Sequence, residues 1–173
     1  MSTRIVALDP GGTTGWAYVD IRDDGTLEFH HGMLESQNHH NELRDLLYGL
    51  LYNLEGHRVV EYYNIVCESF EYRNASRPGL ELVSVEYIGV MKLFCQEFNI
   101  PYHMQSASQG KIRDKPTAFV KPDNLKKLGL WSPNMIHAMD AYGHLLYFLI
   151  NDQSKVNFAA GALHLLNKGW KTN

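Results

Sequence analysis

Three acidic side chains stand at places where a buried acid needs a physical reason. Asp9 ends the apolar run "RIVALD", Glu68 lies at the end of the apolar run "YYNIVCES", and Asp140 lies within "HAMDAYGHLL". A carboxylate in apolar surroundings is costly without a partner, and carboxylates brought together repel one another. A bound divalent cation relieves both costs, and a set of oxygen ligands favours magnesium or manganese.

Two histidines accompany the third acid. His137 precedes Asp140 by three residues and His144 follows it by four, so all three side chains share one face of a helix. Simpler roles also fit these residues. Asp9 could bond the backbone amides of the following "GGTT", Glu68 could face water, and the histidines could form helix-surface pairs with Asp140.

The elements that must position these residues follow one another in a mixed order. The "DDGT" stretch is a hairpin turn signal, and Ser132 with Pro133 is typical of an N-cap followed by the first helical position. Apolar periodicity and turn residues predict strands over 4–9, 14–21 and 27–34, a helix from 36 to near 56, a strand over 62–69, a helix over 80–98, a strand over 100–107, loop with short helices over 108–130, and a helix over 132–150.

This order predicts an α/β fold with a mixed sheet. Three strands in a meander pair antiparallel, whereas helices between the later strands imply parallel pairing. Five strands in this order, three antiparallel and two parallel, match the ribonuclease H-like fold. We expect one ribonuclease H-like domain over residues 1–151 and a tail over 152–173 that holds a short helix packed on the domain.

The amino-acid composition bears on three questions: membrane association, cellular compartment and nucleic-acid binding. The longest apolar stretch has six residues, far short of the roughly 20 that span a bilayer, so we expect no membrane partner. Cys67 and Cys95 lie in apolar contexts and are expected to be reduced, which indicates the cytoplasm. Charge is uneven: residues 1–100 carry 15 acidic and 7 basic side chains, and residues 101–173 carry 4 and 9. The basic part could bind a phosphate backbone or could be a solvated face.

The motifs "LDPGGTTGWA", "IVCESF" and "HAMDA" together resemble the RuvC-type Holliday junction resolvase family of the ribonuclease H-like superfamily. The likeness spans about residues 3–150 and is greatest to the small variants of bacteriophages. It implies that Asp9, Glu68, His137 and Asp140 bind two Mg²⁺ ions, with Mn²⁺ as a substitute. It also places Lys111 and Lys115 of "QGKIRDK" near the scissile phosphate.

The same resemblance implies a metal-dependent endonuclease that cuts branched DNA, with a four-way junction as the first expectation and forks or flaps as alternatives. It would act in the cytoplasm, which is that of the host if a phage encodes the protein. A homodimer follows from the two cuts that a junction requires. The helix over 80–98 could supply the dimer interface through Leu82, Val85, Tyr87 and Met91, although core packing explains these residues equally well. The residues expected to bind DNA are Phe70, Tyr72, Arg73, Arg77, Lys111, Arg113, Lys115 and Lys121.

Two other functions fit part of the pattern. An aspartate followed by glycines and threonines between two strands is also the phosphate-binding loop of actin-like ATPases and sugar kinases. That superfamily needs two such domains around its nucleotide, which this length does not supply. The remaining alternative is a module that binds branched nucleic acid without cutting it.

Overall fold

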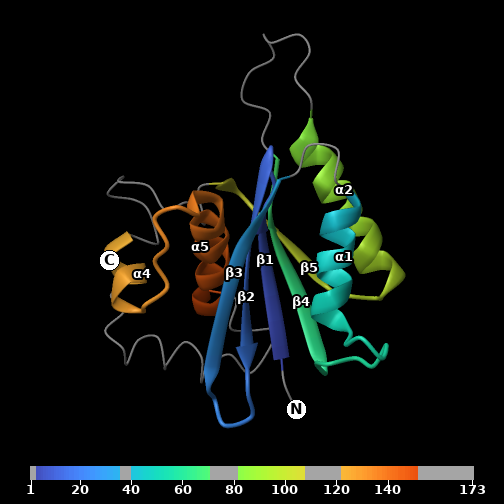
Figure 1. Ribbon diagram of the computed structural model, residues 1–173, viewed down its shortest axis with the longest axis horizontal. Coiled ribbons are helices and arrows are strands. Elements are labelled where there is room, and N and C mark those ends of the chain that lie inside the picture. Colours follow the sequence, from blue (N-terminus) through green and yellow to red (C-terminus); the bar gives the residue numbers. More distant parts are fainter. Residues whose placement is uncertain (1–2, 36–39, 71–81, 108–121, 152–173) are drawn as a thin grey trace.

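The computed structural model describes residues 3–35, 40–70, 82–107 and 122–151 (Figure 1). Nine elements lie within these ranges. They are β1 (Thr3–Asp9), β2 (Thr13–Ile21), β3 (Leu27–Glu35), α1 (His40–Leu51), β4 (Tyr62–Glu68), α2 (Val83–Glu97), β5 (Tyr102–Gln105), α4 (Pro122–Lys127) and α5 (Ile136–Asn151).

The five strands form one sheet in the order β3-β2-β1-β4-β5. β1 pairs antiparallel with β2, and β2 antiparallel with β3, whereas β1 with β4 and β4 with β5 are parallel. The expected α/β fold with a mixed five-stranded sheet is confirmed. β1 has a neighbour on each side and helices over both faces, which explains its nearly continuous apolar sequence.

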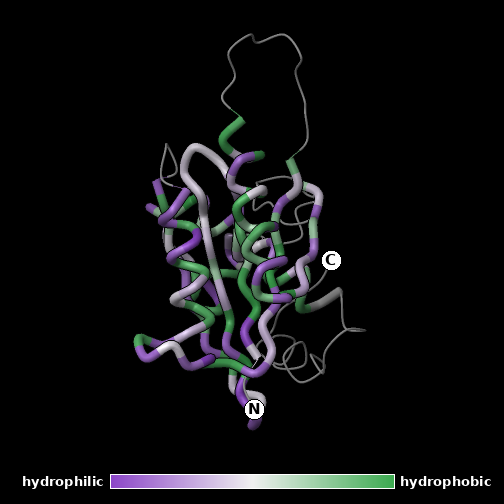
Figure 2. The backbone as a smooth tube through the Cα atoms, turned by 90° about the vertical axis from the view of Figure 1, so that its right-hand side faces the viewer, coloured by the Kyte–Doolittle hydropathy of each residue, from purple (hydrophilic) through white to green (hydrophobic). Residues whose placement is uncertain are grey.

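Helices cover the two faces of the sheet separately. α1 and α2 pack on one face, around a core that includes Val6, Leu8 and Ile65. α5 packs on the other face, where Ile5, Ala7 and Val66 belong to a second core together with the buried side chains of the helix. Alternate residues of one strand thus enter different cores, as the two-residue repeat of a strand requires. Seen from the side of α1 and α2, polar and apolar stretches alternate along the chain (Figure 2).

Two predicted helix ends are wrong. α1 ends at Leu51 rather than near Gly56, and the residues that follow it form turns and an isolated bridge from Tyr52 to Arg58. α5 begins at Ile136, so Ser132 is not its N-cap. The amide of Met135 donates to the carbonyl of Ser132 at 3.2 Å, which closes a turn before the helix. Ser-Pro-Asn is as typical of a β-turn as of a helix start, and the turn prevails here.

Both cysteines are buried and unpaired, as the sequence predicts. Within the described ranges, no helix is long and apolar enough to cross a membrane. Residues 152–173, for which a short packed helix is predicted, lie outside the described residues.

Candidate active site at the carboxyl ends of β1 and β4

Two neighbouring parallel strands bring Asp9 and Glu68 to the same edge of the sheet. The register of β1 and β4 pairs Leu8 with Cys67, so the two acids are the next residues along each strand. Each acid makes a contact with a histidine of α5. Both carboxylates therefore lie on the sheet face that α5 covers, although the acids are 59 positions apart in the sequence.

The start of α5 approaches the sheet very closely at this edge. Gly15 of β2 pairs with Asp9 of β1. A Cβ atom added at Gly15 would lie 2.0 Å from the carbonyl oxygen of His137 and 2.6 Å from the amide nitrogen of Ala138. No side chain fits in that space, so glycine is required for the helix to bring His137 against the end of β1.

Asp9 and His137 form the first pair of the site. Oδ2 of Asp9 lies 3.2 Å from Nδ1 of His137, and the carboxylate is buried while the imidazole is 48% exposed. The turn that follows Asp9, from β1 to β2, is closed by a hydrogen bond. The amide of Gly11 donates to the hydroxyl oxygen of the fully buried Thr14 at 3.5 Å. The sequence predicted that Asp9 and His137 act at one site, and the fold brings them into contact.

Glu68 forms a second pair, with His144. Oε2 of Glu68 lies 3.2 Å from Nε2 of His144, and Nδ1 of the same ring lies 2.8 Å from Oε1 of Gln105. Gln105 is the partner of Glu68 in the register of β4 and β5. His144 is 0% exposed and Gln105 is also buried, so this chain of contacts lies under the surface of the site.

Negative charge at this edge acts on a neighbouring thiol. Burial raises the pKa of Cys67 above its usual value, and the charges of Glu68 and Asp9 raise it further. Lys92 acts in the opposite direction. The thiol of Cys67 therefore lies close enough to the ends of β1 and β4 for both carboxylates to disfavour its ionisation.

Asp140 is buried on α5, three residues after His137 and four before His144. The four predicted ligands therefore come from two adjacent strand ends and the helix that faces them. Carboxylates with one imidazole are donor atoms that suit a magnesium or manganese ion. In the described part of the chain, however, no three His, Cys, Asp or Glu side chains stand grouped so as to hold an ion. The donor types fit a metal site, and assembling three of them around one ion requires side chains to turn from their present partners.

Most of the predicted DNA-binding residues cannot be placed. Phe70, two residues after Glu68, is 37% exposed, so its ring is not buried in the core. The others lie outside the described residues: Tyr72, Arg73, Arg77, Lys111, Arg113, Lys115 and Lys121. Their roles, including that of the two lysines at the scissile phosphate, stay predictions.

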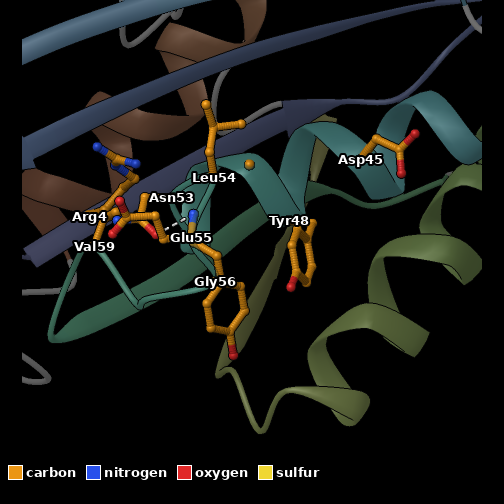
Figure 3. Close-up of a pocket in the computed structure, with 10 residues that line it drawn as sticks. Arg4, Asp45, Tyr48, Asn53, Leu54, Glu55, Gly56 and Val59 are labelled. Carbon is orange, nitrogen blue, oxygen red and sulfur yellow. Dashed lines mark hydrogen bonds between the residues drawn. The ribbon is translucent and has the colours of Figure 1, made fainter.

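A separate hollow lies at the opposite end of β1. Its volume is about 960 Å³, and its lining includes Arg4, Tyr48, Tyr52 and Val59 (Figure 3). The guanidinium of Arg4 is already bonded to Asp20 at 2.6 Å and to the carbonyl of Leu50. None of the residues predicted for the site is among the described residues that line this hollow.

The chain matches no protein-family model and no curated protein sequence. Its fold, however, is similar to solved structures. RuvC from Thermus thermophilus superimposes with a TM-score of 0.58 at 15% identity, over 84% of this chain and 92% of that one. The same protein in complex with a Holliday junction substrate gives 0.57 at 16% identity, over 84% and 91%. The chain has a RuvC-like fold. A yeast mitochondrial Holliday junction resolvase matches with a TM-score of only 0.36, at 15% identity over 97% of this chain and 77% of that one.

Proposed function

We propose that this protein is a metal-dependent endonuclease that cuts branched DNA, with a four-way junction as its substrate. One observation supports the proposal above the others. On a RuvC-like fold, the parallel ends of β1 and β4 present Asp9 and Glu68 to a helix that carries His137 and Asp140. One solved structure with this fold is a complex with a Holliday junction substrate, which supports the choice of substrate.

The proposed cofactor is a pair of Mg²⁺ ions, for which Mn²⁺ can substitute. Two such ions, when bound, supply Lewis acidity to the attacking water and to the leaving 3′-oxygen. Asp9 would help to hold both ions, Glu68 would hold one of them, and His137 with Asp140 would hold the other. The side chain of His137 is about half exposed. Its imidazole can therefore turn from Asp9 toward a metal ion without disturbing the core.

The proposed DNA contacts are aromatic and basic residues that follow Glu68 in the sequence, together with the basic residues from Lys111 to Lys121. Phe70 and Tyr72 follow Glu68 closely in the sequence, so bases at a branch point could stack on them within reach of the carboxylates. Arg73, Arg77 and the basic residues from Lys111 to Lys121 would bind the phosphate backbone. Lys115, with Lys111 as the alternative, would neutralise charge on the scissile phosphate.

We further propose that the protein acts as a homodimer through α2. Val85 and Leu93 are 41% and 66% exposed, and Gly89 between them is open, so these three residues form an apolar stripe along one side of the helix. Tyr87 and Met91, which the sequence also offered for this interface, are instead buried in the core. Leu93→Glu should shift the protein to monomer in sedimentation velocity, whereas Lys92→Glu, beside the stripe, should leave the dimer intact. A dimer unaffected by Leu93→Glu would exclude this interface.

The reduced state of both cysteines supports a cytoplasmic setting, which we propose is that of a host cell infected by a phage.

Cleavage of end-labelled four-way, Y-shaped and linear duplex DNA with and without magnesium tests the proposed activity. We expect paired nicks in the four-way junction only when metal is present. Asp9→Asn and Asp140→Asn should each abolish cutting but retain junction binding, because loss of a carboxylate weakens the metal site and lessens repulsion of the phosphates. Hydrolysis of ATP without any DNA cleavage would instead favour an actin-like ATPase. Binding of junctions by wild type without cleavage would favour a non-catalytic module.

A further inference from the structure

A buried histidine and a buried glutamine adjoin the carboxylate of Glu68, and neither was predicted as part of the site. His144 lies 3.2 Å from Oε2 of Glu68 through Nε2 and 2.8 Å from the side-chain amide of Gln105 through Nδ1. The three side chains come from α5, β4 and β5. They link the helix to two strands directly beneath the candidate site.

The chemistry of these groups fixes the direction of one hydrogen bond. An ionised carboxylate can only accept, so Nε2 of His144 carries a hydrogen and donates it to Glu68. The amide of Gln105 offers an oxygen acceptor and an NH₂ donor, so it can complement Nδ1 of the ring in either protonation state. Full burial allows the ring little freedom, because α5 packs closely on the sheet around it.

We propose that His144, oriented by Gln105, is a positioning residue that fixes the carboxylate of Glu68 for metal binding. The inference rests on the proposed function, because it takes Glu68 to be a metal ligand. A bond from His144 to Oε2 limits rotation of the carboxyl group about its last torsion, so Glu68 meets a cation without first losing conformational freedom. Hydrogen-bond partners of metal ligands contribute roughly 10–100-fold to metal affinity.

A purely structural role for His144 makes a different prediction. If the ring only fills space between α5 and the sheet, an apolar side chain of similar size would change stability but not metal affinity. Positioning requires a donor at Nε2, which His144→Leu removes and His144→Gln can restore through its amide NH₂.

Titration of the full-length protein with Mn²⁺, followed by electron paramagnetic resonance without DNA, separates these roles. We expect His144→Leu to raise the Kd for Mn²⁺ about 10–100-fold, and His144→Gln to stay close to wild type. In cleavage assays, His144→Leu should need more magnesium for half-maximal rate, with a smaller change in the rate at saturation. Tyr142→Phe is the matched control, because it removes a buried hydroxyl on the same helix that bonds His31 at 3.1 Å and leaves Glu68 untouched.

Each outcome decides the matter. If His144→Leu is folded by circular dichroism and binds Mn²⁺ as wild type does, the positioning role is wrong while the proposed nuclease stands. If His144→Leu does not fold, Gln105→Met decides instead, with a smaller loss of affinity expected and an unchanged Kd refuting the proposal. If wild type itself binds no divalent cation, both the positioning role and the proposed metal-dependent function are overturned.

Discussion

Gly15→Ala should disable the site without removing any of its functional groups. The added Cβ would lie 2.0 Å from the carbonyl oxygen and 2.1 Å from the carbonyl carbon of His137. Both are backbone atoms, which cannot rotate away. Real Cβ contacts essentially never fall below 3.0 Å, so the start of α5 must move from β2 by about 1 Å. That shift carries His137 and Asp140 away from Asp9.

The size of the effect follows from that displacement. A misplacement of about 1 Å can cost roughly 100-fold in rate, so cleavage of a four-way junction under single-turnover conditions should fall by about that factor. Overpacking costs about 1–3 kcal/mol, which lowers the Tm of a domain this size by about 2–12 °C. The protein should therefore remain folded at 25 °C, and the rate should be measured there.

Gly12→Ala provides the matched control for this prediction. Gly12 lies three residues before Gly15, in the turn between β1 and β2, yet a Cβ there would meet nothing within 4 Å. Its rate and Tm should stay near those of wild type. If Gly15→Ala cuts junctions as fast as Gly12→Ala does, the close approach of α5 does not position the reacting groups, and the reasoning fails.

Three further predictions concern metal binding, the aromatic ring of Tyr72 and the buried hydroxyl of Tyr63. Millimolar Mg²⁺ or Mn²⁺ should raise the Tm of wild type but not of Asp9→Asn in differential scanning fluorimetry, because the cation binds only the native carboxylates; equal shifts in both would contradict a site at Asp9. Tyr72→Ala should slow junction cleavage roughly tenfold or more, since stacking contributes about 1–3 kcal/mol per base. Cleavage of single-stranded DNA should change less. Equal losses on every substrate would exclude base stacking. Tyr63→Phe should leave the free energy of unfolding unchanged or raise it by about 1 kcal/mol in urea titrations. The reason is that the hydroxyl of Tyr63 is buried without a hydrogen-bond partner among the described residues. A marked loss of stability would show that this hydroxyl does have a partner.

The succession of strands and helices along the chain and the main acids could be predicted because their signals are local. Apolar runs that end in an acid mark β1 and β4, and a turn signal marks the β2–β3 hairpin. The ends of α1 and α5 were less predictable, since Ser132 and Pro133 suit a turn and a helix start equally. Which apolar residues of α2 are buried depends on how α1 packs against it, so Tyr87 and Met91 could not be separated from Val85 beforehand.

The contacts of Glu68 could be predicted only in part from the sequence. The position of His144 on the same helix face as Asp140 was visible in the sequence, but nothing local pointed to Gln105. That contact exists because β5 pairs with β4 in one register, which places Gln105 opposite Glu68. A shift of one residue would turn Gln105 to the other face of the sheet. Register depends on the whole sheet, so the pairing of these three residues required the structure.

The wide separation of the site residues along the chain has a consequence for folding. The bond between Asp9 and His137 joins positions 128 residues apart, and α5 is the last described element. During synthesis, β1 and β4 can pair well before α5 has been made, and that intermediate has both strand acids but lacks His137 and Asp140. If the proposed function is right, a nascent or partly folded chain without α5 would not cut DNA. Activity should return with the slowest long-range folding step, so recovery of cleavage after dilution from denaturant would report the docking of α5 on the sheet.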